Sequence, residues 1–517
     1  MSSPVSIQDG LFTTNTLASK KFLLVYILII WGSLLPVLIE IFVFWTLIKD
    51  FILLFYYLFP LIICFGFLTL IITSTLLSKL GLIIIKNLHE PKQGKFRMER
   101  IDKDYYYWSL RAVVKKLPIW TANLIPSSFI HNLILKLLGI KTDYSNNISN
   151  GNIDTEFIEL GSNISIGQGC SIRSSMIIKG HLIITKISIG DNVIIGSNSF
   201  IAPGTHIGSN TVLGAMSVTK INQNLESNTV YIGNPAEKLH YSPQNQTKIR
   251  KEMEFLNPSD KIYNPIPNDS EEKFVKNLPL NVLTFGIIYF LSNIIPILGT
   301  FYYFNEFILP IYLLKPTIIH VFIDLHTLLI LLITPLFIII LLLVNLFVVI
   351  LLTKLVYKIS QYNNPAKEGI YHWSNKTPDF NNYFKRSFFL RYAKWKIQKS
   401  PFPWLMKPAF NFIGNCQFGK DSVIENCFIA KEFLKVGRNS YLGKALLANH
   451  LWDKNLTIKR IIIGDNVAIS DNCCIAPGTE IENNVTILPL VVTSKNEKLS
   501  PNSTYNYNNN IGDNHTD

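Results

Sequence analysis

Residues 189–220 read IGDNVIIGSNSFIAPGTHIGSNTVLGAMSVTK, and residues 463–494 read IGDNVAISDNCCIAPGTEIENNVTILPLVVTS. The two stretches are identical at 16 of 32 positions, without a gap and at a constant offset of 274 residues. An internal repeat indicates the architecture of a chain more directly than local patterns do. We therefore expect the 517-residue chain to hold two copies of one structural unit.

Aliphatic residues recur every six positions through both copies. The first series is Leu160, Ile166, Ile172, Ile178 and Ile184, then, after a one-residue slip, Ile189, Ile195, Ile201, Ile207 and Leu213; the second is Phe418, Ile424, Ala430, Val436 and Leu442, then Ile463, Ile469, Ile475, Ile481 and Ile487. A period of six is neither that of a helix nor that of a half-buried strand. It fits a chain that turns every six residues, with one inward aliphatic side chain per short strand and Gly or Asn at the corners. Stacked coils of this kind bury the aliphatic column and pair their backbones.

This pattern resembles the left-handed parallel β-helix of hexapeptide-repeat acyltransferases, over residues 156–240 and 411–495. The layout of the whole chain also resembles the C-terminal membrane module of polylysine-synthetase-like nonribosomal peptide synthetases. His450-Leu451-Trp452-Asp453 ahead of Ile463-Gly464-Asp465 is the local match that carries this second resemblance. The expected fold is a mixed membrane protein with about four transmembrane helices and two left-handed parallel β-helix domains, produced by internal duplication.

The composition favours a membrane protein. Only 16% of the residues are charged, whereas soluble domains have about 25%. Apolar stretches that are long enough to cross a bilayer lie within residues 22–85 and 280–357, two in each range. We expect each pair to form a transmembrane hairpin. Residues 307–322 are apolar but interrupted by Pro310, Lys315 and Pro316, so we predict a re-entrant or lumenal segment there, with a fifth span as the alternative.

Basic residues predict the orientation. Residues 86–116 hold nine Lys or Arg against four acidic residues, and residues 367–407 hold nine against two. Positive charge stays on the cytosolic side, so we expect both β-helices in the cytosol. The same regions are rich in Tyr and Trp, which suits contact with lipid headgroups better than a nucleic-acid interface. They belong to two longer regions that we call collars, residues 86–155 and 358–410.

The expected division of the chain follows. It comprises an N-terminal tail (1–21), hairpin 1 (22–85), collar 1 (86–155), β-helix 1 (156–240), a linker (241–279), hairpin 2 (280–357), collar 2 (358–410), β-helix 2 (411–495) and a disordered tail (496–517). Six cysteines without a Cys-x-x-Cys spacing predict reduced thiols and neither a disulfide scaffold nor a zinc site. We expect no bound metal and no permanent cofactor.

The acyltransferase resemblance implies a histidine general base on a loop that leaves the β-helix. His450 lies where the six-residue spacing breaks, because 21 residues separate Leu442 from Ile463. Asp453 follows it closely and could orient the imidazole. His181 precedes Ile189 as the expected counterpart in the first copy, without an insertion around it. The alternative is that these residues are solvated surface side chains.

Gly233, Asn234, Pro235 and Ala236 follow the first β-helix. The resemblance implies that such a tail lies near the pantetheine arm of an acyl donor; a plain turn is the alternative. The donor would be an acyl-CoA or a carrier-protein thioester. Since one copy has the better histidine loop and the other the better tail, we expect a composite site between the two β-helices.

The predicted function is a membrane-bound acyl or aminoacyl transferase that acylates an amine or a hydroxyl. The alternative is a non-catalytic membrane scaffold that uses the β-helices for assembly. A transporter is disfavoured because the apolar stretches carry almost no internal charge. The expected partners are the lipid bilayer and the thioester donor, with no nucleic acid, and assembly into a homo-oligomer is left open.

Overall fold

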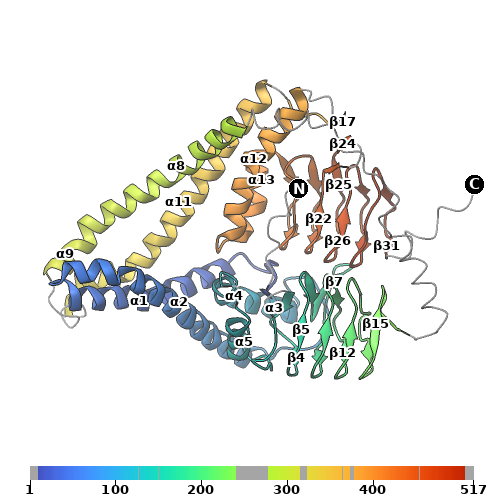
Figure 1. The fold of residues 1–517 in the computed structure, drawn as a ribbon, viewed down its shortest axis with the longest axis horizontal. Coiled ribbons are helices and arrows are strands. Elements are labelled where there is room, and N and C mark those ends of the chain that lie inside the picture. The colour runs from blue at the N-terminus through green and yellow to red at the C-terminus, as the bar shows by residue number, and fades with distance from the viewer. Residues whose placement is uncertain are drawn as a thin grey trace, which may run out of the picture.

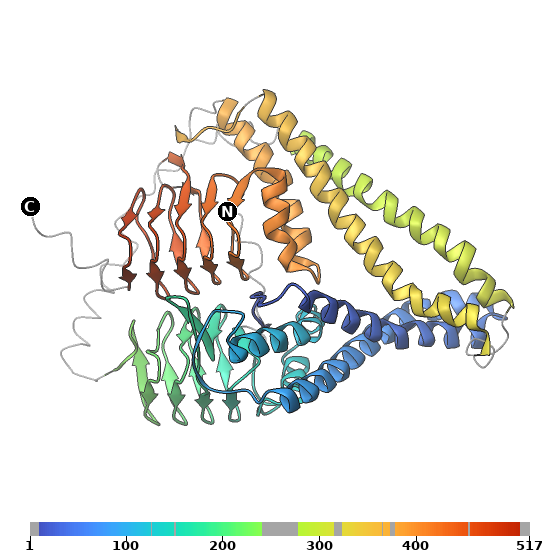
Figure 2. The same ribbon diagram turned by 180° about the vertical axis from the view of Figure 1, so that it is seen from behind.

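The computed structural model describes residues 10–125, 127–148, 151–239, 278–314, 323–363, 365–372, 378–452 and 455–506. Long helices lie at one end and two blocks of short strands at the other (Figure 1). Figure 2 shows from behind that the two blocks lie side by side. We call residues 151–238 the first β-stack and residues 416–505 the second β-stack.

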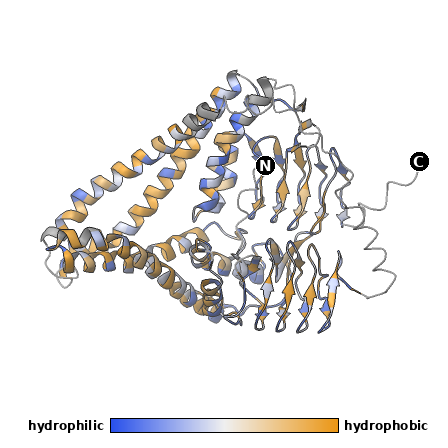
Figure 3. Cartoon of the chain, viewed as in Figure 1, coloured by the Kyte–Doolittle hydropathy of each residue, from blue (hydrophilic) through white to orange (hydrophobic). Residues whose placement is uncertain are grey.

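The long helices form two hairpins. The first consists of α1 (Phe22–Ile48) and α2 (Ile52–Leu88), and the second of α8 (Leu278–Tyr303) and α11 (Leu325–Asn363). All four contain a segment long and apolar enough to cross a membrane, and all are largely orange in Figure 3. The protein therefore has the helices of a membrane protein.

The segment after α8 contains a π-helical turn, η3 (Phe304–Ile308), and a short helix, α9 (Leu309–Leu314). Both belong to the region predicted as re-entrant. Residues 315–322 lie outside the described residues, so the re-entrant path of 307–322 stays a prediction.

Shorter helices form the collars. Collar 1 contains α3 (Lys103–Val114), α4 (Lys116–Ala122) and α5 (Ser128–Leu137); collar 2 contains α12 (Pro378–Lys399), η4 (Pro403–Leu405) and α13 (Met406–Ile413). A buried ion pair ties each collar to its β-stack. Arg111 Nε lies 2.9 Å from Glu156 Oε1, and Arg386 Nε lies 2.7 Å from Glu432 Oε1. These pairs occupy matching places in the two halves, which indicates a structural role.

The first β-stack is built from three parallel sheets. Their strand orders are β1 (Gly10–Phe12), β3 (Gly151–Asp154), β6 (Cys170–Ile172), β11 (Phe200–Ile201); β4 (Ile158–Leu160), β9 (Ile187–Ile189), β12 (His206–Ile207), β14 (Asn224–Leu225); and β5 (Ser165–Ile166), β10 (Ile194–Ile195), β13 (Val212–Leu213), β15 (Val230–Ile232). A last strand, β16 (Glu237–Lys238), pairs antiparallel with β15. Ile194 pairs with Val212 and Val212 with Val230, so one coil takes 18 residues and three strands.

The second β-stack repeats this plan. Its sheets are β18 (Cys416–Phe418), β20 (Leu434–Val436), β25 (Ile461–Ile463), β28 (Glu480–Ile481), β30 (Lys498–Leu499); β19 (Val423–Ile424), β21 (Tyr441–Leu442), β26 (Ala468–Ile469), β29 (Thr486–Ile487), β31 (Thr504–Tyr505); and β22 (Leu446–Leu447), β27 (Cys474–Ile475). The stack therefore extends to Tyr505, and the boundary predicted at residue 495 is too early. The predicted disordered tail begins within a region that has regular strands.

Asparagine holds the corners of both stacks. Asn192, Asn198, Asn210, Asn222 and Asn228 all have φ between 56° and 59°. Asparagine tolerates this left-handed conformation better than most residues do. Side-chain amides also form a ladder along one edge, in which Asn192 donates to Asn210 at 3.2 Å and Asn210 to Asn228 at 3.0 Å. The second stack repeats this ladder from Asn466 to Asn502.

A hairpin protrudes from each stack and pairs with a strand from the collar. In the first stack β7 (Ser175–Ile178) and β8 (His181–Ile184) join β2 (Gly94–Arg97); in the second, β23 (His450–Trp452) and β24 (Asn455–Ile458) join β17 (Gly369–His372). The prediction that no insertion surrounds His181 is therefore wrong. Ile178 and Ile184 belong to this hairpin and not to the inner column, which continues from Ile172 to Ile187.

The N-terminal segment is part of the core and not a free tail. β1 pairs with β3 of the first stack, and Thr13, Thr14 and Thr16 are buried. We call residues 10–16 the strap. It crosses from the first β-stack to the second and contacts both.

Candidate functional site

His450 is the first residue of the second protruding hairpin. Its side chain is half-buried against Tyr383 of α12, with 5.8 Å between ring centroids. Burial, and secondarily the positive charge of Lys431, lowers the pKa of His450 to about 4. The imidazole is therefore neutral at physiological pH, and it is a weaker base than an ordinary histidine.

Asn449 orients this imidazole. Its Oδ1 lies 3.2 Å from His450 Nδ1. An amide oxygen accepts only, so this contact is a hydrogen bond when Nδ1 carries the proton, and Nε2 then keeps the lone pair. A base held by a second side chain in this way is the usual arrangement of a catalytic histidine. Asp453, predicted for this role, lies outside the described residues.

His181 occupies a different place. It lies in β8 and its Nδ1 is 2.9 Å from the carbonyl oxygen of Lys179. Strand pairing identifies the true counterpart of His450: Ser175 pairs with Ile184 as His450 pairs with Ile458, and Ile184 and Ile458 are 274 residues apart. The expected equivalence of His181 and His450 is therefore wrong.

The tail Gly233–Ala236 closes the last coil of the first stack. The N–H of Ala236 donates to the Val218 carbonyl at 2.7 Å, and Gln223 Nε2 donates to the Ala236 carbonyl at 2.7 Å. Asn234 Nδ2 reaches Pro489 O of the second stack at 3.4 Å. The tail thus lies at the junction of the stacks, but among the described residues no hydrogen bond joins it to His450 or His181.

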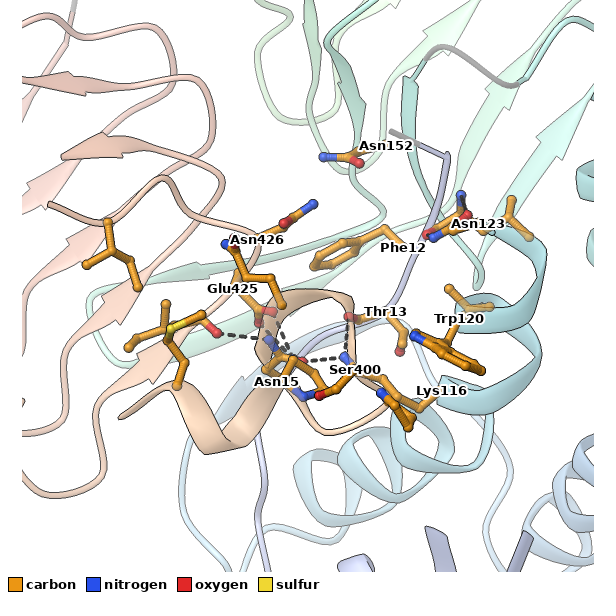
Figure 4. Close-up of a pocket in the computed structure, with 18 residues that line it drawn as sticks. Phe12, Thr13, Asn15, Lys116, Trp120, Asn123, Asn152, Ser400, Glu425 and Asn426 are labelled. Atoms are coloured by element: carbon orange, nitrogen blue, oxygen red, sulfur yellow. Dashed lines mark hydrogen bonds between the residues drawn. The ribbon is translucent and has the colours of Figure 1, made fainter. Parts of the chain in front are cut away.

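A cavity of about 90 Å³ lies where the two halves meet near the helices (Figure 4). The strap, α4, the segment 398–406 and the first coil of the second stack line it. Asn123 and Asn152 enter from the first half, and Glu425 and Asn426 from the second. Trp120 lines this cavity and donates to the Lys399 carbonyl at 3.1 Å. Trp404 donates to the carbonyl of Asn15, another lining residue, at 3.1 Å.

Glu425 and Lys116 hold the strap in this cavity. Both Asn15 N–H, at 2.8 Å from Glu425 Oε2, and the Thr14 hydroxyl donate to the Glu425 carboxylate. Lys116 Nζ donates to the Thr13 carbonyl at 3.2 Å and to Asn15 Oδ1. Burial raises the pKa of Glu425 and lowers the pKa of Lys116 to about 8. Burial in this cavity thus favours the uncharged form of both groups. Shifted pKa values of this kind are typical of functional sites, but buried ion pairs with a purely structural role have them too.

Sequence reasoning missed Asn449, Lys116 and Glu425. A signal for Glu425 was present, because it follows the column residue Ile424 at a position where glycine stands in many repeats. Among the described residues, no group of three or more His, Cys, Asp or Glu is arranged to hold a metal ion.

Part of the first β-stack matches a known protein family in sequence. Residues 186–220 match the family model of the bacterial transferase hexapeptide (six repeats). The chain carries a hexapeptide-repeat segment. This segment covers strands β9 to β13 of the first stack. No curated protein matches the chain in sequence.

Solved structures are similar to this chain over about a fifth of its length. A mutant of AntD, an N-acyltransferase from Bacillus cereus in complex with dTDP-4-amino-4,6-dideoxyglucose and coenzyme A, is 21% identical over 19% of this chain and 60% of its own, with a TM-score of 0.15. A maltose O-acetyltransferase from Clostridium difficile 630 is 22% identical over 21% of this chain and 73% of its own, with a TM-score of 0.16. A hexapeptide-repeat containing acetyltransferase from Vibrio cholerae is 23% identical over 20% and 65%, with a TM-score of 0.14. The chain thus spans 60% of the length of the AntD chain.

Proposed function

We propose that the protein is a membrane-bound acyltransferase whose two β-stacks are left-handed parallel β-helices derived from one duplicated unit. The match of residues 186–220 to the bacterial transferase hexapeptide is the observation that carries this proposal. The four apolar helices anchor both stacks in a bilayer. The excess of Lys and Arg in both collars favours a cytosolic position for the stacks.

In the proposed reaction an amine or hydroxyl of the acceptor attacks the carbonyl carbon of a thioester. A C–N or C–O bond forms, the C–S bond breaks, and the thiol of the donor leaves. Nε2 of His450 takes the proton of the attacking group and returns it to the departing thiolate. General-base help of this kind contributes about 10²–10⁴-fold to a rate.

The donor is a thioester of acyl-CoA or of a carrier protein. We assign the tail Gly233–Ala236 to the donor's pantetheine arm, in line with the family resemblance of this tail. Its Asn234 lies at the junction of the two stacks, where a donor bound along one stack meets residues of the other. The resemblance of the sequence layout to polylysine-synthetase-like modules supports the proposal of an aminoacyl group as the cargo.

The test is turnover by the purified protein in lipid nanodiscs. Acyl-CoA and aminoacyl-carrier donors are offered with a panel of amine and hydroxyl acceptors, and both the free thiol and the acylated product are measured. We expect His450→Ala to reduce turnover by about 10²–10⁴-fold and Asn449→Ala to reduce it less. His206→Ala is the matched control, because His206 lies on the exposed side of β12, where its Nδ1 bonds Ser188 Oγ at 2.6 Å.

Full activity of folded His450→Ala protein would remove His450 as the base. A loss of turnover in His181→Ala but not in His450→Ala would assign the general base to His181 of the first β-stack. If wild-type protein turns over none of the donors, the scaffold alternative replaces the enzyme.

A further inference from the structure

A cavity of about 270 Å³ lies between the two membrane hairpins. Three parts of the chain line it: the second half of α1, the end of α8 together with η3 and α9, and the first half of α11. Four of its lining residues carry a hydroxyl, and the others are aliphatic residues or phenylalanines. The proposed acyl transfer makes no use of this cavity.

The cavity lies at the end of the hairpins that is farther from the β-stacks. Figures 1 and 2 show that the two hairpins meet at the end of the molecule opposite the stacks. Phe42 lines the cavity, and α1 ends at Ile48, about 9 Å farther along the helix axis at 1.5 Å per residue. Thr327 lines it close to Leu325, where α11 begins. When the hairpins span a bilayer, the cavity therefore faces the leaflet farther from the stacks.

The hydroxyl groups on the cavity wall have partners within the protein. Their bonds are Thr300 Oγ1 to the Pro296 carbonyl at 2.7 Å, Thr327 Oγ1 to Asp324 Oδ2 at 2.6 Å, Thr334 Oγ1 to the Ile330 carbonyl at 2.7 Å, and Tyr303 OH with Thr334 Oγ1 at 2.9 Å. A water molecule in a cavity needs two to four polar partners, and an engineered cavity of about 150 Å³ lined by Leu, Ile and Phe stays dry and binds benzene. The wall of this larger cavity therefore suits an apolar occupant better than water.

Contacts between the helices hold the cavity open. Pro335 has no N–H and disturbs the backbone hydrogen bonds of the preceding turn of α11. Trp31 Nε1 of α1 donates to a carbonyl of that turn, Leu332 O, at 2.6 Å. The ring of Tyr303, at the end of α8, stacks on Phe337 of α11 with 4.1 Å between centroids. These contacts fix α1, α8 and α11 around the cavity, so its space is already present without an occupant.

The cavity opens sideways, toward the hydrocarbon of the bilayer. Its inner wall is buried, since Phe42 is 6% and Thr334 5% exposed. Its rim is exposed on three elements, with Ile41 at 38%, Phe304 at 45% and Ile338 at 40%. Exposed apolar side chains on membrane-spanning helices face lipid. A hydrocarbon chain can therefore enter between these rim residues without crossing a polar surface.

We propose that this cavity binds one hydrocarbon chain of a membrane lipid from the leaflet farther from the β-stacks. Lipid chains are as apolar as leucine, so packing contacts and not removal from water stabilise the bound chain. The side chains around an empty cavity lack these contacts. A chain in the cavity touches α1 and α11 at once and thus joins the first hairpin to the second. The proposal does not depend on the proposed function, because His450 lies at the other end of the molecule, beside β24 (Figure 1).

Photocrosslinking tests the site on the full-length protein. Delipidated protein in maltoside micelles is titrated with phosphatidylcholine that carries a diazirine at the end of one chain, irradiated, digested and mapped by mass spectrometry. We expect labelling that saturates in residues 38–42, 300–311 and 327–341. Labelling of Leu24 and Leu28, which are 65% and 61% exposed on α1, should rise in proportion to the probe without saturation.

Competition separates two sources of the chain. Excess unlabelled phosphatidylcholine and excess free fatty acid are added in separate experiments. Loss of the saturable labelling with either competitor supports a site for a hydrocarbon chain, and the stronger competitor identifies the source. Saturable labelling that neither competitor removes would overturn the proposal, and so would labelling spread evenly over the exposed residues of all four helices.

Filling the cavity provides the second test. Leu38→Trp should abolish the saturable labelling, because the larger side chain occupies the space of the lipid chain. Leu28→Trp is the matched control, since it makes the same change on the same helix at an exposed position outside the cavity. Leu38→Phe replaces Leu38→Trp in the same assays if the tryptophan variant does not fold.

Thermal unfolding supplies a readout that is independent of the photoprobe. A ligand that binds only the folded state raises the melting temperature. We expect added phosphatidylcholine or fatty acid to raise the melting temperature of delipidated wild-type and Leu28→Trp protein, but not that of the folded cavity-filled variant. An equal rise in all three proteins, or saturable labelling of the filled variant at the wild-type level, would overturn the proposal.

Discussion

At the scale of single residues, the environment of His450 fixes its protonation. Burial lowers the pKa of His450 to about 4, and the charge of Lys431 contributes in the same direction. An unfolded histidine titrates at about 6.5. The unfolded chain therefore binds more protons than the folded chain between these values, so His450 adds stability above pH about 6.5 that is lost as the pH falls toward 4.

A change at Lys431 should move this titration. We expect Lys431→Met to raise the pKa of His450, because a nearby like charge no longer disfavours the imidazolium. The acid limb of the rate profile, or the histidine NMR titration, should shift to higher pH. Lys435→Met is the matched control, since Lys435 is an exposed lysine of the same stack. An unmoved titration in folded Lys431→Met protein would contradict the electrostatic coupling.

The sequence located some functional residues and missed others for identifiable reasons. The break in six-residue spacing predicted that the chain leaves the stack near His450, and β23 begins there. Asn449 carried no signal, because its role depends on the direction of a side chain. His181 was misassigned because the apolar residues of the first hairpin, Ile178 and Ile184, keep the six-residue spacing of the inner column.

At the scale of the coil, the close approach of successive turns limits which residue fits a corner. A Cβ on Gly196 would meet the backbone nitrogen of Ala215 in the next turn. Backbone cannot move aside as a flexible side chain can, so we expect Gly196→Ala to destabilise the first stack by about 1–3 kcal/mol. Thermal unfolding in detergent measures the change.

Gly286→Ala provides the control for this prediction. Gly286 lies in α8, and nothing lies within 4 Å of the position that its Cβ would take. Alanine is the better helix former, so this change should be neutral or stabilising by up to about 1 kcal/mol. Equal melting temperatures of the two variants would mean that the turns are not in tight contact at Gly196.

The period of six predicted the strands well and the ends poorly. An inward aliphatic residue recurs every six positions in each coil, so this spacing identifies the residues in the interior of a stack directly. The ends depend on pairing with other parts of the chain. β1 of the strap extends the first stack at one end, outside the six-residue pattern. β30 and β31 extend the second stack at the other end, where Leu499 and Tyr505 keep the spacing but Thr493 interrupts the apolar series.

At the scale of the whole molecule, a buried ion pair locks the two stacks together. Arg173 and Asp471 are each 5% exposed, and Arg173 also lies over the ring of Phe12 at 3.3 Å. Removing one member of a buried pair leaves an uncompensated charge and costs about 3–5 kcal/mol. We therefore expect Arg173→Met to lower the stability of the chain by about this amount, and Arg173→Met with Asp471→Leu to recover most of the loss.

The exposed pair Arg438 and Asp465 is the matched control, at 2.9 Å with side chains 75% and 32% exposed. Arg438→Met should cost at most about 1 kcal/mol. Melting temperatures in one detergent compare all variants. If the double variant were as unstable as Arg173→Met alone, packing and not charge would hold the stacks together.

The strap also determines the order in which the molecule can be completed during synthesis. Glu425 leaves the ribosome 410 residues after its partner Asn15. Contacts between residues so distant in sequence form late, since the intervening chain must be ordered first. The first hairpin can therefore enter the bilayer with its N-terminal segment still loose at one edge. The strap can bind the second β-stack only after Glu425 has been made, so a chain truncated before Glu425 lacks the carboxylate that binds Asn15.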